Sequence, residues 1–498
     1  MSTVSTIIPT HNYGRTIGEA LDSIASQKLA PAEVIVVDDG STDNTPKVVE
    51  ARKKSLPQII YMKQERRGAS AARNAGAAKA TGDFLHFFDA DNVLLPDFYL
   101  YLANILAENP ALGAVCCQRY YRYGESSRRY AADRCWAREL PLGKAMEIDN
   151  PLDTLTMLVR RSFFEELGGF NEEFPIIQDV EFAWRLLARA PVEVTPERHA
   201  VYRLHGGGLS NTDVATHIER LLQAEAAAAA DRETYGALAE TYLQYWLAVF
   251  YEQAGRLDEA EARLERLFAA SPEHPAGHLL HVRLMLAQDR EASSEAEALH
   301  VRLPECACVV ATLARVRDSE GKPHEAVGLL ERAVELELDD VERERHRLDL
   351  GDVLTSSGDW EEAEAVFRDV LNEAEAPDVR ARALAGLAFL RAASDEQDAA
   401  EELVSAEPDE AIALRATYNL ASQLEAAGYG EEAIEVFGRV AASPLAEREG
   451  LAAGAHYHLG SLYAAAGDVE QARKFLKTCL RLNPEHQRAA AVLQELLE

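Results

Sequence analysis

Cysteine is scarce in this sequence, and long apolar runs are absent. The chain has 498 residues and six cysteines. Cys116 lies beside Cys117 and Cys306 close to Cys308, spacings that suit neither a disulfide framework nor a four-ligand zinc site. No run approaches the roughly 20 apolar residues of a membrane-spanning helix, and the N-terminus lacks the regions of a secretory signal. We therefore expect a cytoplasmic protein without a transmembrane segment, at most peripheral to a membrane.

Basic residues are also in short supply, above all in the second half of the chain. The sequence holds 51 Lys and Arg against 83 Asp and Glu, a formal net charge of −32. Residues 216–498 hold 27 Lys and Arg against 55 Asp and Glu, and so carry −28 of that charge. Like charge repels nucleic acid and anionic lipid before any contact is made. We therefore expect no nucleic-acid ligand, and a basic partner fits the second half better.

Short β-branched runs and helix-like stretches alternate up to about residue 215. The runs are "TVSTIIPT", "AEVIVVDDG", "QIIYMKQ" and "GDFLHFFDAD". This alternation predicts an α/β domain with a mainly parallel sheet covered by helices. After residue 215 the strands vanish, and the Ala-rich stretch 224–233 has high helix propensity. We expect domain 1–215, a helical connector 216–240, and an all-helical domain 241–498.

The second half repeats itself. A glycine followed five residues later by an alanine recurs at Gly255, Gly321, Gly358, Gly428 and Gly467. Two of the gaps are about twice a period near 34, so "AQDREASSEA" and "ASDEQDAA" are candidates for degenerate units. This pattern resembles tetratricopeptide repeats, with an ordinary helical bundle as the alternative. About seven units would stack into a solenoid that binds a peptide or protein, or that serves for dimerisation.

Acidic residues stand where strands end in the first half. "IIPTHNYGR" and "VIVVDDGSTDNT" each end a strand and turn into a helix, at the sheet edge where nucleotides tend to bind. Asp89 and Asp91 follow "DFLHFF" and suit a hard divalent cation bridging phosphate oxygens. A solvated turn is the simpler interpretation of such a pair.

Two further residues with potential chemistry lie later in the chain. Asp179 opens a helix, where a carboxylate is either a general base or a partner of the helix dipole. His205 precedes three glycines and is either a metal ligand or a structural residue. Residues 120–150 are rich in Arg and aromatic side chains, so Trp136, together with Trp184, is a candidate for the acceptor site. Packing beneath a surface excursion is the alternative for this segment.

Taken together, these segments resemble inverting glycosyltransferases of family 2, which have the Rossmann-like GT-A fold. The resemblance covers residues 3–212 and rests on Pro-Thr-x-Asn, Asp-Asp-Gly-Ser, Arg-Asn, Asp-x-Asp, Gly-Gly-Phe-Asn and Tyr-Arg-x-His, in that order. It implies a nucleoside-diphosphate sugar donor, with UDP favoured, and Mn²⁺ or Mg²⁺ as cofactor. The implied donor-site residues are Pro9, His11 and Asp39 at the base, Arg73 near the nucleotide, Asp89 at the ribose, and Asp91 and His205 at the metal.

The resemblance also implies the reaction. Asp179 matches the catalytic base, which would take the proton of an acceptor hydroxyl as it attacks the anomeric carbon, with inversion of configuration. The family's usual Glu-Asp pair is Gln178-Asp179 here, which puts acceptor type or activity in doubt and makes Gln178 an acceptor-site candidate.

Three functions are therefore open. The first is a transferase whose repeats recruit a protein acceptor or partner. The second is a polysaccharide or lipid-linked-sugar transferase whose repeats serve for assembly. The third is a nucleotide-binding scaffold with impaired catalysis.

Overall fold

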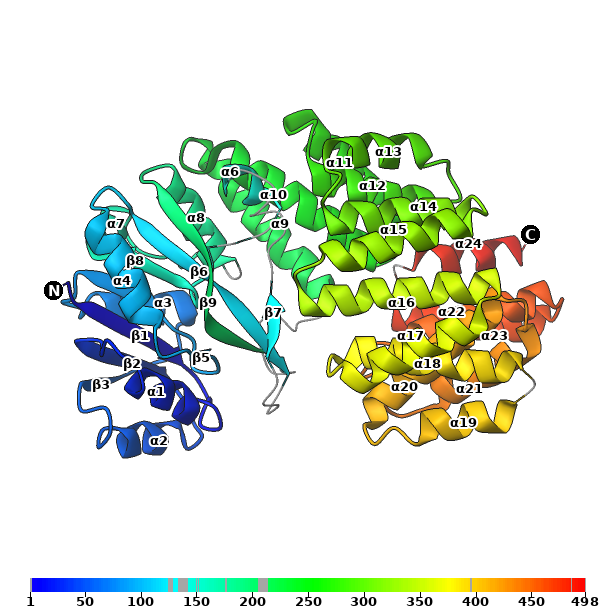
Figure 1. Cartoon of the computed structure of the whole chain (residues 1–498), viewed down its shortest axis with the longest axis horizontal. Helices are drawn as coiled ribbons and strands as arrows, with labels where there is room; N and C mark the ends of the chain where they lie inside the picture. The colour runs from blue at the N-terminus through cyan, green and yellow to red at the C-terminus, as the bar shows by residue number, and fades with distance from the viewer. Residues whose placement is uncertain are drawn as a thin grey trace. The chain divides into compact units, whose positions relative to one another are not determined.

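The structure is a computed structural model of the whole chain (Figure 1). It describes residues 2–123, 129–132, 142–148, 150, 152–174, 177–204, 214–394, 396–484 and 486–497. Within this described part, every helix is too short or too polar to span a bilayer. The chain divides into two compact units, Met1–Leu247 with Glu265–Pro272, and Ala248–Leu264 with Glu273–Glu498.

The first unit alternates strands and helices along most of its length. Its strands are β1 (Val4–Thr10), β2 (Glu33–Asp39), β3 (Ile59–Gln64), β4 (Phe84–Phe87), β5 (Val93–Leu94), β6 (Ala114–Tyr123), β7 (Tyr130–Ala132), β8 (Met157–Arg160) and β9 (Val192–Leu204). Its helices are α1 (Ile17–Ala25), α2 (Thr45–Arg52), α3 (Ala69–Ala77), α4 (Phe98–Glu108), α6 (Leu142–Ala145), α7 (Arg161–Glu166), α8 (Gln178–Leu187) and α9 (Val214–Ala230), and α10 (Arg232–Gln253) begins in this unit.

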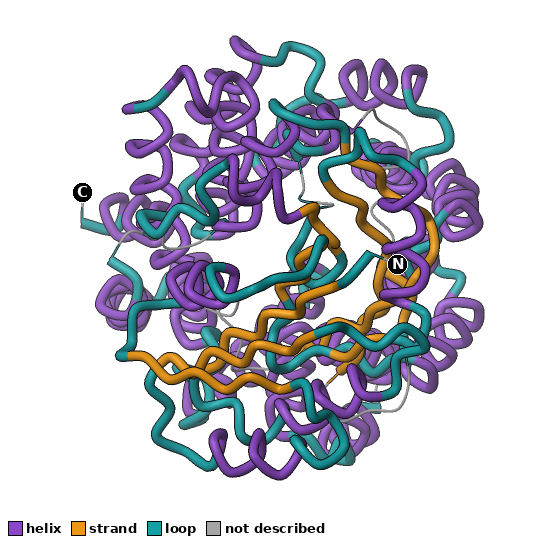
Figure 2. The backbone as a smooth tube through the Cα atoms, turned by 90° about the vertical axis from the view of Figure 1, so that its left-hand side faces the viewer, coloured by secondary structure: helices purple, strands orange, loops and turns teal. Residues whose placement is uncertain are grey.

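The strands form one nine-stranded mixed sheet in the order β3-β2-β1-β4-β8-β6-β9-β5, with β7 paired to β6 (Figure 2). Strands β3, β2, β1 and β4 are parallel neighbours, as the sequence predicts. The rest of the sheet is mixed because β8 runs antiparallel to β4 and β6, while β9 is parallel to β6. The carboxyl ends of β1, β2 and β4 therefore lie along one edge of the sheet.

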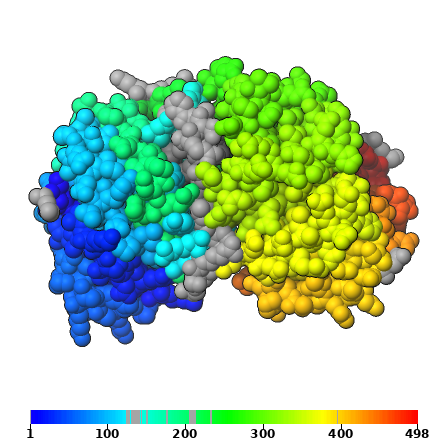
Figure 3. All heavy atoms as spheres, viewed as in Figure 1, coloured from blue at the N-terminus to red at the C-terminus, as the bar shows by residue number. Residues whose placement is uncertain are grey.

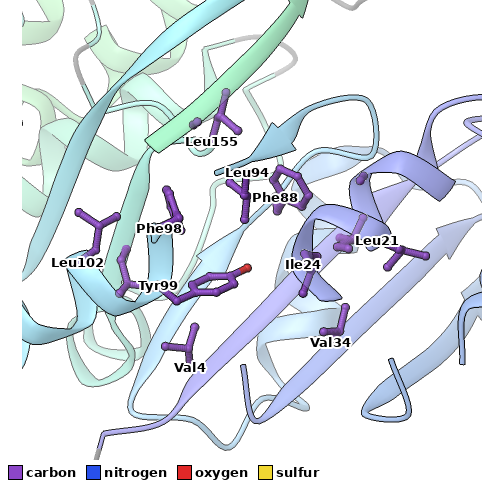
Figure 4. Packing of buried hydrophobic residues seen from close by; sticks show 14 of the residues in the cluster. Val4, Leu21, Ile24, Val34, Phe88, Leu94, Phe98, Tyr99, Leu102 and Leu155 are labelled. Atoms are coloured by element: carbon purple, nitrogen blue, oxygen red, sulfur yellow. The ribbon is translucent and has the colours of Figure 1, made fainter. Parts of the chain in front are cut away.

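Helices pack on both faces of the parallel half. On one face, Leu21 and Ile24 of α1 belong to the same buried cluster as Val34 of β2 (Figure 4). On the other face, α3 approaches β1 closely because Gly76 has no side chain: a Cβ there would lie 2.4 Å from Ile7 Cγ2. Burial of each large apolar side chain contributes about 1.5–3 kcal/mol to the free energy of unfolding. This packing holds the strands in place, and with them the positions of their carboxyl ends.

The later helices of the chain follow one another in pairs. They are α11 (Leu257–Ala270), α12 (Pro275–Ala287), α13 (Ser293–Arg302), α14 (Ala307–Ser319), α15 (Pro323–Leu336), α16 (Asp340–Ser357), α17 (Trp360–Glu373), α18 (Pro377–Ala393), α19 (Gln397–Ser405), α20 (Glu410–Ala426), α21 (Gly430–Ala442), α22 (Ala452–Ala465), α23 (Val469–Leu482) and α24 (Gln487–Glu495). On the face of the second unit that Figure 3 shows, successive colours from green to yellow lie side by side. The predicted α/β domain followed by an all-helical repeat region is confirmed.

The repeated glycines of the sequence all stand between the two helices of a pair. They adopt left-handed φ values of 72° at Gly255, 73° at Gly321, 89° at Gly358, 87° at Gly428 and 81° at Gly467. Glycine enters this conformation without the steric cost that a Cβ brings. In the degenerate unit "AQDREASSEA", Asp289 takes the same place with φ of 55°.

Candidate functional site

The loops after β1 and β2 are tied together at the carboxyl edge of the sheet. Asn12 Oδ1 accepts a hydrogen bond from the backbone N–H of Thr42 at 2.8 Å, and Ser41 Oγ accepts from the N–H of Asn12 at 3.0 Å. Asp43 Oδ2 accepts from the N–H of Gly14 at 2.9 Å. Asn12 has φ of 61°, a left-handed conformation that Asn tolerates better than most residues. The two loops therefore form one rim.

Two of the residues predicted to bind the nucleobase, Pro9 and His11, lie at this rim. Pro9 is buried near the end of β1, in register with a residue of β2. The half-buried ring of His11 places Nδ1 3.0 Å from the backbone oxygen of Asp39. His11 therefore links the ends of β1 and β2, and its stacking on a nucleobase stays a prediction.

The third predicted nucleobase residue, Asp39, is engaged by the chain itself. The residue is 5% exposed, and its carboxylate accepts three hydrogen bonds, each at 2.8 Å. The donors are the Gln64 side chain and the backbone N–H groups of Arg67 and Gly68. Asp39 thus holds the loop that leads into α3, and any contact with a nucleobase would add to this role.

Arg73 and Asp89 form an ion pair beside this rim. Arg73 lies on α3 and is buried, and its Nη2 donates to Asp89 Oδ1 at 2.8 Å. The guanidinium lies over the ring of Phe170, 5.6 Å from its centroid. Asn74 holds Phe170 in place, because its Nδ2 donates to the Phe170 backbone oxygen at 2.8 Å. The Arg-Asn motif and the Gly-Gly-Phe-Asn motif therefore meet in the fold.

The Asp-x-Asp turn after β4 is anchored by a residue of β9. Arg203 Nε donates to the backbone oxygen of Asp91, and the Arg203 N–H donates to Asn92 Oδ1, both at 3.0 Å. Glu19 of α1 pairs with Arg203 and, at 2.7 Å, with Arg122 of β6. The hydrogen bond from Arg122 is the main cause that holds the pKa of Glu19 below its usual value. This cluster fixes the backbone from which both carboxylates project.

Tyr13 stands next to the same two carboxylates. Burial raises the pKa of the Tyr13 hydroxyl, and the negative charges of Asp91 and Asp89 together with a hydrogen bond to Asp91 raise it further. The hydroxyl therefore stays protonated at physiological pH and serves Asp91 as a hydrogen-bond donor. Tyr13 lies three residues after the end of β1, so residues that follow β1 and β4 meet in this part of the site.

The chemistry of Asp89 and Asp91 suits a hard cation. Both are half-buried carboxylates, and Mg²⁺ and Mn²⁺ prefer oxygen ligands. Within the described ranges, no group of three or more His, Cys, Asp or Glu is placed to hold a metal ion. His205, the other predicted ligand, lies outside the described residues. A divalent cation at this turn would be held by the two carboxylates and would supply positive charge there.

Asp179 is the second residue of α8, and as a whole residue it is half-buried. Asn150 Nδ2 donates to Asp179 Oδ2 at 2.9 Å, and the N–H of Val180 donates to Oδ1 at 3.0 Å. Burial raises the pKa of Asp179 above its ordinary value, Arg73 and backbone N–H groups oppose this, and the charge of Asp89 adds to the rise. A raised pKa makes the ionised carboxylate a stronger proton acceptor.

The backbone just before Asp179 is strained. Ile177 has φ of 54° at the start of α8, a left-handed conformation that is unusual for a β-branched residue. Such strain costs of order 1–3 kcal/mol and concentrates at functional sites. The fold therefore holds the start of α8 in a conformation that local preference opposes.

The residues predicted for the acceptor site differ in their placement. Trp184 is only 2% exposed, and its ring packs edge-on against Tyr235 and Tyr242 of α10 at centroid distances of 6.4 and 5.6 Å. It belongs to the interior between α8 and α10, so it has no free face to offer an acceptor. Gln178 is half-buried at the start of α8, and Trp136 lies outside the described residues.

Sequence reasoning missed three residues of the site. Arg203 belongs to the Tyr-Arg-x-His motif and Tyr13 to "HNYGR", so both stood in segments already singled out. Asn150 had no such signal, because it lies 29 residues before Asp179 in a segment without periodicity. Only the tertiary fold brings Asn150 and Asp179 together.

Family models match both halves of the chain. Residues 5–168 match the model of glycosyl transferase family 2, a range that includes Asp39, Arg73, Asp89 and Asp91 and ends before Asp179. Residues 348–381 and 453–486 match tetratricopeptide-repeat models.

Curated relatives are similar over part of the chain. The uncharacterized glycosyltransferase YibD of Escherichia coli (strain K12) is 34% identical over 113 residues, which are 23% of this chain and 33% of the relative. The validoxylamine A glucosyltransferase of Streptomyces hygroscopicus subsp. limoneus is 30% identical over 238 residues, 41% of this chain and 52% of the relative. The chain thus spans about a third to a half of the length of these two relatives.

Solved structures of glycosyltransferases also align with this chain. A mannosyltransferase from Pyrobaculum calidifontis, solved in complex with GDP-Man and Mn²⁺, aligns with a TM-score of 0.41 at 24% identity, covering 63% of this chain and 87% of that one. Residues 1–349 of TarS from S. aureus, solved with UDP, align with a TM-score of 0.40 at 18% identity, covering 64% and 91%.

Proposed function

We propose that this chain is an inverting transferase, which moves a sugar from a nucleoside-diphosphate sugar to an acceptor hydroxyl. It carries a glycosyltransferase family 2 domain followed by tetratricopeptide repeats. The observation that carries this proposal is the meeting of Asp179, with its raised pKa, and the Arg73–Asp89 ion pair at one site. Asp179 accepts the proton of the acceptor hydroxyl as that oxygen attacks the anomeric carbon. The nucleoside diphosphate leaves from the opposite face, so the configuration inverts.

The donor side of the site is assigned to the strand ends. Asp89 faces the ribose, Arg73 lies near the nucleotide, and the rim of His11 and Asp39 receives the base. A divalent cation held by Asp91 and His205 would neutralise charge that develops on the diphosphate. Arg203 keeps the Asp-x-Asp turn in place through the backbone of Asp91.

The role of the repeats is part of the proposal. Residues 216–498 carry a charge of −28, which favours a basic protein surface as their ligand. We infer that the repeats recruit a protein acceptor or partner, with dimerisation as the competing role. Cross-linking of the full chain at micromolar concentration tests the competing role. Cross-links between copies of the chain favour dimerisation, and their absence favours recruitment of another protein. The cytoplasmic location stays a prediction.

Turnover of sugar nucleotides tests the catalytic claim. We expect the wild-type chain with Mn²⁺ to release nucleoside diphosphate from at least one of UDP-glucose, UDP-GlcNAc and GDP-mannose. Asp179→Asn should lower kcat at least 10²-fold, because general-base help is typically worth about 10² to 10⁴-fold. Asp22→Asn, on the exposed side of α1, is the matched control and should keep wild-type turnover. Equal release by wild type and Asp179→Asn would remove Asp179 from the mechanism, and no release with any donor would favour a non-catalytic scaffold.

The melting temperature measured with free nucleotides tests which nucleotide the sugar donor carries. A ligand that binds the native state raises the melting temperature according to its affinity. We expect UDP with Mn²⁺ to raise Tm more than GDP with Mn²⁺ at equal concentration. A larger shift with GDP would reassign the donor to a GDP-sugar and leave the catalytic proposal standing.

A further inference from the structure

The hydrogen bond from Asn150 to Asp179 has a fixed direction. Asn150 is 7% exposed, and its Oδ1 accepts from the backbone N–H of Leu152 at 3.0 Å. The amide nitrogen Nδ2 is therefore the atom that faces Asp179 Oδ2, at 2.9 Å. Because Val180 N–H holds Oδ1, both carboxylate oxygens of Asp179 have a donor, and the carboxylate plane is fixed.

The segment that carries Asn150 is held by helices from the later part of the chain. Trp246 of α10 donates through Nε1 to the backbone oxygen of Ile148 at 2.9 Å. Ser271, just after α11, donates through Oγ to Glu147 Oε2 at 3.0 Å, and both side chains are buried. All of these residues belong to the first compact unit. Asn150 thus stands two residues beyond a backbone oxygen that α10 fixes.

A second contact with the first turn of α8 comes from Tyr235, which directly precedes the break in α10 at Gly236. The Tyr235 hydroxyl donates to Glu181 Oε1 at 2.8 Å, and Glu181 is fully buried. Glu181 in turn pairs with Arg185, which donates to the backbone oxygen of Gly169 at 2.8 Å. Two separate lines of contact therefore run to the first turn of α8, one from Trp246 and one from Tyr235, on either side of the break in α10 at Gly236.

We propose that Asn150 is a positioning residue for Asp179, and that α10, through Trp246, holds Asn150 in place. This inference rests on the proposed function, in which Asp179 is the base. Orientation matters because a displacement of about 1 Å in a reacting group can cost roughly 10²-fold in rate. Burial and the charge of Asp89 oppose ionisation of Asp179, and Arg73 favours it. The Asn150 amide also favours the ionised form, because it donates a hydrogen bond to that carboxylate.

Two substitutions of Asn150 separate positioning from simple structural support. Asn150→Asp keeps the acceptor for Leu152 but replaces the donor that faces Asp179 with a like charge. Asn150→Ala removes both. We expect kcat to fall about 10²-fold or more in Asn150→Asp and about 10-fold or more in Asn150→Ala, with KM for the sugar nucleotide within about three-fold. The limb on which kcat rises with pH should move to higher pH in both variants, since each makes ionisation of Asp179 harder.

A second pair of variants tests the link to α10. Trp246→Phe keeps most of the ring and removes only the N–H that reaches Ile148, and should lower kcat by about 3- to 10-fold. Trp360→Phe is the matched control, because Trp360 Nε1 donates to a backbone oxygen, that of Thr355, at 3.2 Å in the second compact unit. It should leave kcat unchanged.

All variants are assayed in the full chain with Mn²⁺ and whichever of UDP-glucose, UDP-GlcNAc and GDP-mannose the wild type turns over fastest. Full activity of Asn150→Asp beside an impaired Asn150→Ala would reduce Asn150 to a support for Leu152 and overturn the inference. Should Asn150→Asp not fold, equal kcat of Trp246→Phe and Trp360→Phe still overturns the link to α10. If Asp179→Asn keeps full turnover, the proposed base falls first, whereas an inactive Asp179→Asn beside fully active Asn150 variants overturns this inference alone.

Discussion

At the scale of single residues, His86 shows how burial fixes a charge state near the site. It lies on β4, three residues before Asp89, and is fully buried. Its Nδ1 lies 3.1 Å from the Tyr99 hydroxyl, and its Nε2 lies 3.1 Å from the Leu155 backbone oxygen. Burial lowers the pKa of His86 from 6.5 to about 3. The ring is therefore neutral at physiological pH, and it packs as a polar member of the core.

This pKa shift predicts an acid-sensitive fold. Below pH 6.5 the unfolded chain binds a proton at His86, whereas the folded chain keeps this ring neutral. The free energy of unfolding therefore decreases as the pH falls from 6.5 towards 3. The slope from this group approaches roughly 1.4 kcal/mol per pH unit. His86→Asn does not titrate, so it should start less stable at pH 7 and show a shallower loss. Urea unfolding of both chains from pH 7 to 4 measures the difference, and equal slopes would contradict the shifted pKa.

At the scale of elements, the turn glycines decide how each repeat is shaped. Gly358 has φ of 89° and no atom within 4 Å of an added Cβ, so a substitution there meets only the backbone cost. Gly328 also has open space, but it lies inside helix α15, where glycine is the less stable choice. The same substitution at these two positions therefore has opposite consequences.

Alanine at the two glycines should show this difference. Gly358→Ala is expected to destabilise the chain by about 1–2 kcal/mol, because alanine resists the left-handed conformation. Gly328→Ala should stabilise it by about 0.5–1 kcal/mol, the difference in helix propensity. Urea unfolding followed by the far-ultraviolet helix signal measures both. A Gly358→Ala chain as stable as the wild type would mean that the turn relaxes without cost.

At the scale of the whole molecule, helices beyond residue 215 complete the first compact unit. The unit extends through Leu247 and includes Glu265–Pro272. Tyr235 and Tyr242 cover Trp184, and Tyr235 satisfies the buried carboxylate of Glu181. A chain without these helices would expose to water apolar side chains that the fold buries, which costs about 25 cal/mol for each Å² of apolar surface.

Truncation tests this dependence. A chain that ends at residue 215 should aggregate or unfold without cooperativity, because α8 loses its cover. A chain that ends at residue 272 keeps α9, α10 and α11 and should stay monodisperse, with a cooperative thermal transition. Size-exclusion chromatography and near-ultraviolet circular dichroism distinguish the two. A chain 1–215 as well folded as 1–272 would show that α10 is dispensable to this unit.

Local patterns in the sequence were sufficient for the class of fold and for part of the site. Short β-branched runs that alternate with helix-like stretches predicted the strands, and the recurring glycines predicted the paired helices, because both signals arise from local sequence patterns. Asp39, Asp89 and Asp91 could be placed at strand ends, since parallel neighbouring strands end at one edge. The interior position of Trp184 could not be read in this way, because its neighbours come from α10, more than 50 residues later.

The arrangement around Asp179 depends on the tertiary structure. Asn150, Arg73 and Asp89 come from separate segments, and no spacing in the sequence relates them to Asp179. The raised pKa of that carboxylate is a property of this assembly, since it depends on how much water burial removes and on which charges lie near. Residue types could therefore nominate the base, whereas its environment and its support by α10 arise only when distant segments pack together.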